Sequence, residues 1–457
     1  MVNPRGAPLQ LSNHELKDTC HNGLCVSWQA DAPEPTRLAQ RKGSSQSELW
    51  ARSYGVLIGK MIDFPEMRQS LKKIMPIYGT RPEAIKVAPI IKALEASDVL
   101  EPVVTVTGQH REMLDQVNEL FEITPDYDLN IIQPRQTLNA VMAKNIAGLD
   151  EVLEKVDPDA VVVQGDTTTS TAGAIAAFNR GIPVVHAEAG LRSFNIFSPF
   201  PEEANRKITT QLASLHLAPT SVSRDNLLRE TVTADDVYIT GNTVIDALYD
   251  VVDKKVPFDD PALKDVAADV EAGKKVVLVT THRRENQGDA MRGVGRALAR
   301  LADQHSDVLF VLPAHKNPVV REAILPCIED KSNVVVTEPL AYGQFTHLIS
   351  LANVVLTDSG GVQEEAPGLG KPVLVMRENT ERPEAVTAGT VRLIGTAEDT
   401  VYEEVTTLLT NDDAYNAMAA AVNPYGDGKA GKRTVSAIEA LLGVGERMPE
   451  FDDGLGN

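Results

Sequence analysis

Residues 73–96 read KIMPIYGTRPEAIKVAPIIKALEA, and this stretch decides the fold. Its first part, Lys73–Tyr78, is a short apolar segment of the kind that forms a buried strand. Gly79 then allows the backbone to turn tightly. The amphipathic segment Glu83–Ala96 follows, and we expect Pro89 to kink this helix or to end one part of it. A strand, a turn and a helix in this order begin an α/β unit.

The same alternation continues along the chain in two series, with a restart after Thr240–Asp250. Short, continuous apolar strands separated by helices are typical of buried parallel sheets. We therefore predict an α/β fold with two Rossmann-like, doubly wound domains that face a cleft. The other predicted strands are Val103–Thr107, Ala160–Val163 and Pro183–Val185 in the first series, and Lys275–Thr280, Val308–Leu312, Asn333–Thr337, Val354–Leu356 and Pro372–Val375 in the second.

Residues 1–72 differ in composition from the rest of the chain. They hold both tryptophans and a net charge of +2, from nine Lys and Arg against seven Asp and Glu, and no helical or strand period runs through them. We interpret them as an extension that is either disordered or the product of a start codon placed too early, with a regulatory tail as the alternative. The predicted domains are then residues 73–242 and 243–429, and residues 444–457 form a tail.

The composition of the 457 residues argues against several classes of function. A net charge of −20 and an aromatic content of 5% are unsuited to nucleic acid, because a phosphate backbone repels an acidic surface. No apolar run is long enough to span a membrane. Three cysteines, Cys20, Cys25 and Cys327, cannot all pair within one chain, so we expect a reducing cytoplasm. The spacing of Cys20 and Cys25 is not that of a metal site, and we predict none.

Charged and acidic side chains follow the strands of the first series, where a doubly wound domain gathers its ligand residues. Arg81 and Lys86 can present charge to a phosphate, although a solvated helix end explains them as well. Asp166 either belongs to a site or caps the helix that begins near Thr168. Glu188 lies at the equivalent edge one strand later.

A third acidic site follows at Pro201-Glu202-Glu203, where a proline at the first helical position with acids in the first turn is favoured by the helix dipole without any catalysis. The coincidence of three acidic sites at one sheet edge matters more than each motif alone. Clustered carboxylates raise one another's pKa, which suits general acid and base catalysis.

The strand ends of the second series carry cations and small residues. Thr281–Asn286 reads THRREN, and two adjacent arginines in an acidic protein favour an anion site. Asp358–Gly361 reads DSGG and is either a plain glycine turn or a helix N-terminus that exposes N–H groups to a phosphate. Glu364 or Glu365 then accepts from ribose hydroxyls, and Arg382 adds another cation. Motifs for a mononucleotide P-loop, a bound dinucleotide or a zinc protease do not occur in the sequence.

Together these runs resemble the non-hydrolysing UDP-N-acetylglucosamine 2-epimerases. The resemblance covers residues 73–443, in order and at normal spacing. The matching runs are GTRPEAIK (79–86), GQHREMLDQV (108–117), GDTTTS (165–170), HAEAGLRS (186–193), SPFPEEANR (198–206), ITGNTVIDAL (239–248), THRREN (281–286), LTDSGGVQEEAPGLGKPVLVMRENTERPEAVTAGT (356–390) and NPYGDG (423–428).

The resemblance implies the two-domain architecture of B-type glycosyltransferases, with UDP bound by the second domain and a last helix at about 430–443 that crosses back onto the first. It also implies a homodimer. By motif, three acids and one histidine are the catalytic candidates: Asp166, Glu188, Glu202 and His282. His282 also resembles a UDP-sugar contact, and the other contacts by motif are Arg81, Lys86, Phe345, Ser359, Gly360, Gly361, Glu365 and Arg382.

Some family members bind a second UDP-sugar as an activator, and this chain matches that site in part. The matching residues are Gln109, Arg135, Arg283 and His315. Glu112 stands where some members have glutamine, which puts activation in doubt. In the UDP-sugar site itself, Leu340 stands where some members have a glutamine near the uridine.

The activity implied by the resemblance is the reversible interconversion of UDP-GlcNAc and UDP-ManNAc, supplying ManNAc-type sugars for surface polysaccharide or glycan synthesis. It proceeds by elimination of UDP to 2-acetamidoglucal and by its re-addition, with no cofactor and no metal. The sequence does not say which carboxylate is the base and which the acid. A hydrolysing relative, which releases free ManNAc, and a non-catalytic nucleotide-sugar sensor are the alternatives.

Overall fold

The protein is represented by a computed structural model that describes residues 70–108, 111–133 and 135–455. The chain divides into two units, Met1–Arg68 and Gln69–Asn457, and the described residues belong to the second. The predicted extension therefore lies almost wholly outside the described residues. The same holds for Gln109 and for the side chain of Glu112.

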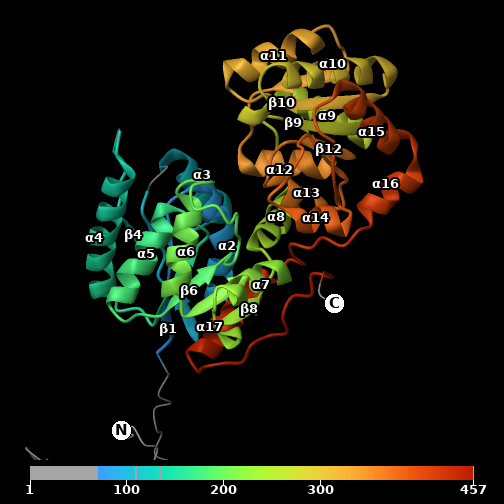
Figure 1. The fold of residues 1–457 in the computed structure, drawn as a ribbon. Helices are drawn as coiled ribbons and strands as arrows, with labels where there is room; N and C mark the ends of the chain where they lie inside the picture. The colour runs from blue at the N-terminus through green and yellow to red at the C-terminus, as the bar shows by residue number, and fades with distance from the viewer. Residues whose placement is uncertain (1–69, 109–110, 134, 456–457) are drawn as a thin grey trace, which may run out of the picture. The chain divides into compact units, whose positions relative to one another are not determined.

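The first sheet has eight parallel strands in the order β4-β3-β1-β5-β6-β7-β8, with β2 beside β1 (Figure 1). Because the order reverses at β1, β1 and β5 form a topological switch point, where ligands of such sheets bind. The strands are β1 (Lys72–Tyr78), β2 (Leu100–Pro102), β3 (Thr105–Val106), β4 (Tyr127–Asp128), β5 (Ala160–Gln164), β6 (Val184–Ala187), β7 (Leu215–Ala218) and β8 (Val237–Ile239). The helices that connect them are α2 (Arg81–Glu95), α3 (Arg111–Phe121), α4 (Leu138–Val156), α5 (Thr168–Asn179), α6 (Glu202–Leu212) and α7 (Ser221–Arg229).

The second sheet has six parallel strands in the order β11-β10-β9-β12-β13-β14, which is the Rossmann order with its switch point between β9 and β12. The strands are β9 (Lys275–Thr280), β10 (Val308–Pro313), β11 (Val334–Thr337), β12 (Val354–Thr357), β13 (Val373–Val375) and β14 (Val391–Leu393). The helices are α8 (Thr243–Lys254), α9 (Pro261–Glu271), α10 (Asp289–Gln304), α11 (Pro318–Ile328), α12 (Tyr342–Leu351), α13 (Val362–Gly368), α14 (Pro383–Ala388), α15 (Glu398–Thr410), α16 (Asp412–Ala419) and α17 (Ala430–Leu441). The predicted α/β class with two doubly wound parallel sheets is confirmed.

Helices cover both faces of each sheet, as buried parallel strands require. Residues of α4 and α5 pack with β1 and β5 on one face of the first sheet, and residues of α2 and α17 pack on the other. Residues of α10, α11 and α15 cover one face of the second sheet. A further core joins α2 and α3 to α8, α12 and the second sheet, so the two sheets share apolar contacts.

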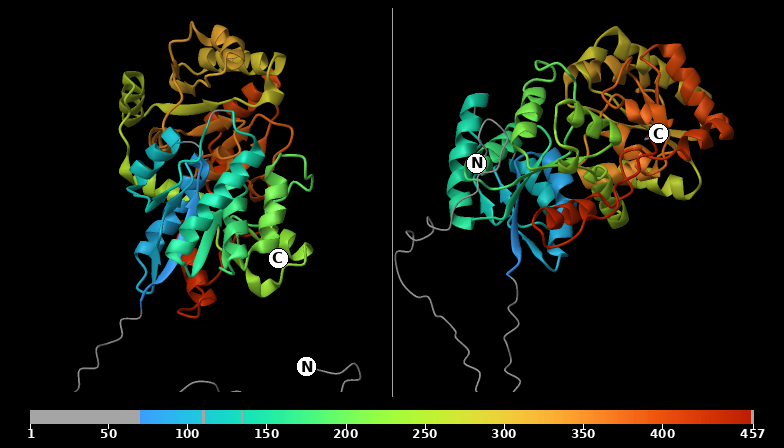
Figure 2. Two further views of the ribbon diagram at one scale, coloured as in Figure 1. Left: turned by 90° about the vertical axis from the view of Figure 1, so that its left-hand side faces the viewer. Right: turned by 60° about the horizontal axis from the view of Figure 1, so that its bottom comes forward.

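The C-terminal helix α17 returns to the first sheet and lies against α2, as the views of Figures 1 and 2 show in red and blue. A Cβ atom at Gly431 would lie 2.7 Å from the carbonyl oxygen of Pro89. Only glycine therefore lets the backbone of α17 approach α2 this closely.

Pro89 does not end its helix, because α2 runs without interruption from Arg81 to Glu95. A proline inside a helix costs about 3 kcal/mol or more. The apolar packing of α2 offsets this cost, since Pro89 and the neighbouring Ile90 and Ile91 are all buried. The prediction that Pro89 ends part of this helix was wrong.

The predicted strand Val103–Thr107 is reduced to β3 (Thr105–Val106), and β2 lies just before the predicted range, at Leu100–Pro102; both strands pair with β1. The carboxylate of Asp126 accepts from the backbone N–H of Val104 at 2.8 Å and takes this donor away from the sheet. Five further strands, β2, β4, β7, β8 and β14, had no counterpart among the sequence-based predictions. They have two to four residues, too few for a clear pattern.

Candidate functional site

The turns after β1 and β5 are tied together at the first switch point. Glu83 accepts from the backbone N–H groups of Gly79 and Thr80 at 3.0 and 2.8 Å, and its second oxygen accepts from the Thr167 hydroxyl at 2.5 Å. A Cβ atom at Gly79 would lie 2.1 Å from the hydroxyl oxygen of Thr107. Close contact across the sheet, rather than an unusual turn, is thus why this position needs glycine.

Glu188 follows β6 and is the most strongly hydrogen-bonded of the three predicted carboxylates. Lys86 and Asn242 donate to its Oε1, the latter at 3.1 Å, and Gln164 donates to its Oε2 at 2.7 Å. The backbone of Glu188 has φ 59°, a left-handed conformation that costs a non-glycine residue about 1–2 kcal/mol. Strain of this kind, held by three donors, is common at functional sites.

Glu188 and Lys86 form a buried ion pair, with side chains that are 9% and 17% exposed. Burial raises the pKa of Glu188, but the charge and hydrogen bond of Lys86, together with Arg382 and Asn242, outweigh it, so the net pKa is lowered. Burial lowers the pKa of Lys86, but the carboxylates of Glu188 and Glu364 raise it by a larger amount, so the net shift is upward. Both groups are therefore charged at neutral pH.

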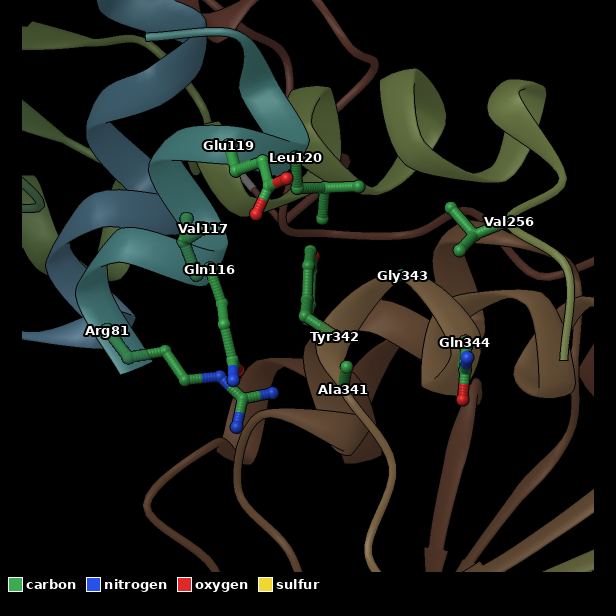
Figure 3. A pocket seen from close by; sticks show the side chains of 10 residues that line it. All are labelled: Arg81, Gln116, Val117, Glu119, Leu120, Val256, Ala341, Tyr342, Gly343 and Gln344. Atoms are coloured by element: carbon green, nitrogen blue, oxygen red, sulfur yellow. The ribbon is translucent and has the colours of Figure 1, made fainter. Parts of the chain in front are cut away.

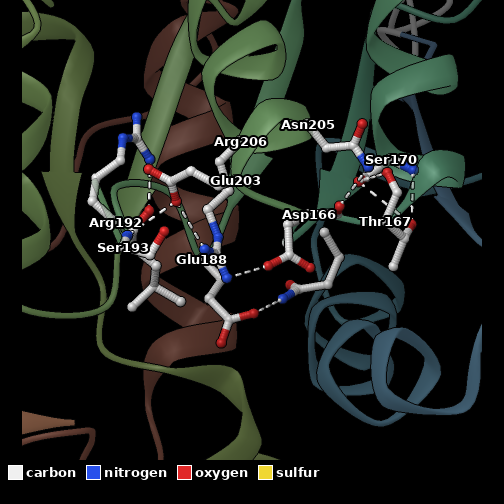
Figure 4. Close-up of polar contacts among 12 residues, drawn as sticks. Asp166, Thr167, Ser170, Glu188, Arg192, Ser193, Glu203, Asn205 and Arg206 are labelled. Atoms are coloured by element: carbon white, nitrogen blue, oxygen red, sulfur yellow. Dashed lines mark hydrogen bonds and ion pairs between the residues drawn. The ribbon is translucent and has the colours of Figure 1, made fainter. Parts of the chain in front are cut away.

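Asp166 does not cap α5, so that interpretation was wrong. Thr167 is the cap, and its hydroxyl accepts from the Ser170 N–H at 3.1 Å. The Asp166 carboxylate instead pairs with Arg206 of α6 at 2.5 Å, and its backbone oxygen accepts from Asn205 at 2.9 Å (Figure 4). Asp166 therefore does not serve as a helix cap, and it lines the same pocket as Glu188.

Glu202 begins α6, with Pro201 in the cap position rather than at the first helical position as predicted. Its Oε2 is buried and has no hydrogen-bond partner among the residues that the structure describes. Such an atom is costly to bury unless a ligand or a movement satisfies it. Glu202 does not line the pocket that Asp166 and Glu188 share.

Asp358 organises the strand ends of the second sheet. Its buried carboxylate accepts from the Thr281 hydroxyl at 2.8 Å, from the backbone N–H of Arg283 at 2.9 Å and from His282 Nδ1 at 3.1 Å. Burial raises the pKa of Asp358, but these hydrogen bonds dominate and hold it at about 2. The ionised carboxylate fixes the tautomer and direction of the His282 ring, whose Nε2 is left for a ligand.

Arg382, Glu364 and Glu365 lie together beyond the strand ends of the second sheet. Arg382 donates to Glu364 Oε1 at 2.7 Å. Glu365 accepts from the Tyr342 hydroxyl at 3.0 Å, and burial raises its pKa to about 7. Glu365 is therefore a carboxyl group that titrates near neutral pH.

Three pockets that share lining residues run through these side chains. One lies at the second sheet and is lined by His282, His315, Leu340, Phe345 and Ser359. The central pocket shares His282, Phe345 and Ser359 with it and adds Glu365 and Arg382.

The third pocket lies at the first sheet and contains Asp166, Glu188 and Arg206. It shares Lys86 and Arg382 with the central pocket. A path lined by cations thus leads from an apolar end at Leu340 and Phe345 to a carboxylate end at Asp166 and Glu188.

Another pocket lies on the far side of Arg81, between α3 and the start of α12 (Figure 3). Its lining is mainly apolar, from Val117, Leu120, Val256 and Tyr342. The Arg81 side chain also borders the two pockets nearest His282.

Comparison with known proteins agrees with this geometry. A family model described as UDP-N-acetylglucosamine 2-epimerase matches residues 92–439. The chain belongs to the UDP-N-acetylglucosamine 2-epimerase family. The predicted family and the predicted enzyme class, an isomerase that acts on a nucleotide sugar, are confirmed.

Members of the family are similar to this chain over their whole length. The UDP-N-acetylglucosamine 2-epimerase of Escherichia coli K12 is 51% identical over 370 residues, which cover 80% of this chain and 98% of that protein. The enzyme from Neisseria meningitidis, solved bound to UDP-GlcNAc, is 46% identical with a TM-score of 0.70 and covers 81% of this chain and 100% of that one. The enzyme from Methanocaldococcus jannaschii, solved with UDP-GlcNAc and UDP, is 33% identical with a TM-score of 0.64, covering 82% and 100%.

The residues predicted for an activator site of this epimerase are brought together only in part. His315 stacks on His282 with ring centroids 5.7 Å apart, and Arg283 donates to the backbone oxygen of Asp358 at 3.3 Å. Arg135 is exposed in a left-handed turn and does not line the pocket of His282 and His315. Gln109 lies outside the described residues.

Several polar residues of the candidate site were given no role of their own from the sequence. They hold or position the predicted side chains across long sequence separations, which no local pattern reveals. They are Gln164, Arg206, Asn242 and Asp358.

Within the described ranges, no group of three or more His, Cys, Asp or Glu residues is placed to hold a metal ion. Cys20 and Cys25 lie outside those ranges, and Cys327 is a free thiol. None of the described helices is both long enough and apolar enough to cross a membrane.

Proposed function

We propose that this chain binds UDP-GlcNAc and UDP in the three connected pockets and interconverts UDP-GlcNAc and UDP-ManNAc by eliminating UDP and adding it back. The observation that carries the proposal is the continuity of these pockets through Lys86 and Arg382. A UDP-sugar has an aromatic base, a doubly charged diphosphate and a sugar in this same order. The bound ligands of the N. meningitidis and M. jannaschii enzymes support it.

The nucleotide occupies the two pockets of the second sheet. Phe345 and Leu340 contact the uracil ring, and the Leu340 side chain supplies apolar contact without an amide hydrogen bond. Glu365 accepts from the ribose hydroxyls. The diphosphate lies against His282, with Ser359, Gly360, Gly361, Arg81 and Arg382 around it. Charge-assisted hydrogen bonds from arginine suit a diphosphate.

The reaction starts with loss of the proton from C2 and breakage of the C1–oxygen bond. The electron pair of the C2–H bond forms the C1=C2 double bond of 2-acetamidoglucal, and the electron pair of the C1–oxygen bond leaves on the β-phosphate of UDP. Arg382 and His282 stabilise this charge as it develops. In the second half, UDP oxygen adds to C1 and a proton is delivered to C2 on the other face. The sum is redox-neutral, so electrons balance without a cofactor.

Asp166, Glu188 and Glu202 carry the protons. Glu188 is ionised and directed by three donors, which suits a group that accepts a proton only when the substrate displaces part of this network. Asp166 faces the same pocket with Arg206 as its partner. Glu202, whose buried oxygen has no partner among the described residues, joins them when the sugar is bound.

Closure of the pockets over the sugar keeps water from the 2-acetamidoglucal intermediate. The enzyme acts in the cytoplasm as a homodimer and supplies ManNAc-type sugars for surface polysaccharide or glycan synthesis.

The proposal is tested by separating binding from chemistry. Asp166→Asn and Glu202→Gln lower kcat by about 10²-fold or more, the usual scale for an acid or base. Calorimetric titration shows little change in their affinity for UDP. Arg382→Ala does the reverse and weakens UDP binding first. Carboxylate variants that lose UDP binding in step with activity contradict these roles, and free ManNAc as the main product of the unaltered protein contradicts the reaction.

A further inference from the structure

Asn242 lies where the chain passes from the first sheet to the second. It follows β8, is 4% exposed and occupies the cap position of α8, where its Oδ1 accepts from the Val244 N–H at 3.1 Å. Its backbone N–H donates to the carbonyl oxygen of Tyr425 at 2.6 Å, in the segment that returns toward the first sheet. Both connections between the sheets therefore meet at this residue.

The amide nitrogen of Asn242 donates to two carboxylates at once. It lies 3.1 Å from Glu188 Oε1 and 3.3 Å from Glu364 Oε2. The orientation of the amide is fixed by its neighbours, because only NH₂ can donate to two carboxylates and only the oxygen can accept from an N–H.

These two carboxylates belong to the two halves of the proposed site. Glu188 and Asp166 line the third pocket, the sugar pocket of the proposed site. Glu364 accepts a hydrogen bond from Arg382 at 2.7 Å in the central pocket. One side chain thus links the acid–base group to the diphosphate-binding arginine.

Capping alone does not explain this arrangement. Asp, Ser and Asn cap helices about equally well, because each offers an oxygen to the first N–H groups. Elsewhere in this chain Asp260, Asn317 and Asn411 cap helices with the side-chain oxygen. Only an amide can cap α8 and donate to Glu188 and Glu364 at the same time.

We propose that Asn242 is a positioning residue for the epimerisation, whose amide sets the direction of the Glu188 carboxylate and fixes it relative to the Glu364–Arg382 pair. This inference rests on the proposed function. It adds a residue that acts through Glu188 rather than on the substrate itself.

The charged and titratable groups that face Glu188 decide what a substitution does. Lys86 approaches from α2, Arg382 from the start of α14, Glu364 from α13 and His186 from β6. Asn242→Asp keeps the cap but adds a third carboxylate beside Glu188 and Glu364, against two cations. Repulsion then raises the pKa of Glu188 and turns its carboxylate away from Lys86.

The experiment compares Asn242→Asp and Asn242→Ser with the full-length protein and with the control Asn411→Asp, an exposed helix cap distant in sequence from the site. For Asn242→Asp we expect kcat to fall by about 10²-fold, the low end of what a positioned acid or base contributes, and the acidic limb of the pH–rate profile to move to higher pH. Asn242→Ser lowers kcat by about tenfold without that movement, since it removes the donor and adds no charge. Both variants also lower the melting temperature, because each disturbs a buried polar network, but kcat falls by more than the loss of folded protein and of calorimetric affinity for UDP accounts for, whereas Asn411→Asp changes none of the three.

An Asn242→Asp protein with the kcat and pH profile of Asn411→Asp overturns the inference, and so does loss of kcat strictly in step with melting temperature in both variants. If Asn242→Asp does not fold, Asn242→Ser tests the inference by the same comparison of kcat with the calorimetric affinity for UDP. Formation of UDP-ManNAc by the unaltered protein is measured alongside. Its absence would instead reject the proposed function.

Discussion

The buried ion pair between Lys86 and Glu188 is the contact whose removal has the most predictable consequences. Both side chains are less than one-fifth exposed, and Lys86 is charged because carboxylates surround it. Glu188→Gln removes the negative charge and leaves the ammonium group buried without its main partner. Lys86→Met leaves the carboxylate in the same position. Each single change therefore costs more than the pair itself contributes.

Breaking a buried pair from one side costs about 3–5 kcal/mol. We expect about 3 kcal/mol for each single variant, the low end of that range, because Glu364 still faces Lys86, and Gln164 and Asn242 still face Glu188. The double variant has neither charge, so its loss of unfolding free energy is well below the sum of the losses in the two single variants. A surface pair, Lys254 with Glu122 at 3.2 Å, serves as the control, with a coupling of about 0.2–1 kcal/mol.

The assay is urea unfolding followed by far-ultraviolet circular dichroism. Tryptophan fluorescence is unsuitable because Trp28 and Trp50 both precede the described part of the chain. A coupling of about 2 kcal/mol or more at Lys86–Glu188 supports the account. Additive effects within about 0.5 kcal/mol, as for independent sites, would refute the claim that the two groups are a charged, desolvated pair.

Three further predictions concern the remaining charges. Burial raises the pKa of Glu365 to about 7, so the contribution of Glu365 to stability is complete below the ordinary pKa of a glutamate and is lost as the pH rises toward 7. Glu365→Gln should therefore raise the melting temperature at pH 8 but not at pH 5. The same substitution should weaken UDP binding in calorimetry. Residues 73–457 carry a net charge of −22, so KCl should raise the melting temperature as the screening length falls from about 10 Å at 0.1 M to about 3 Å at 1 M; a flat or falling curve counts against this. Deletion of residues 1–71 should leave a soluble protein with most of its activity, because β1 begins at Lys72, and insoluble protein would show that these residues are structural.

The sequence was informative where local chemistry determines local structure. The strand at Lys73–Tyr78, the helix after it and the carboxylate at Glu188 follow from apolar runs and turn residues, and the structure has each close to its predicted position. For α5 the sequence offered Asp166 as a possible cap, although Thr167 also carries a capping oxygen and is the cap in the structure. A pattern of several capping residues in a row does not say which one turns toward the helix.

Other features depend on contacts between distant segments. Asp126 shortens a predicted strand by taking the N–H of Val104, and Asn242 meets Glu364 across 122 residues of sequence. The exclusion of Glu202 from the sugar pocket likewise depends on how the loop before α6 folds. Such contacts exist only once distant segments of the chain have come together, so periodicity and propensity cannot reveal them.

The central claim is that the C2–H bond breaks during each turnover while UDP leaves C1. Proton NMR of UDP-GlcNAc incubated with the enzyme in heavy water tests it directly. The account predicts that UDP-ManNAc appears and that solvent deuterium enters C2 of both epimers. UDP-ManNAc that retains its C2 proton, or free ManNAc as the main product, would contradict it.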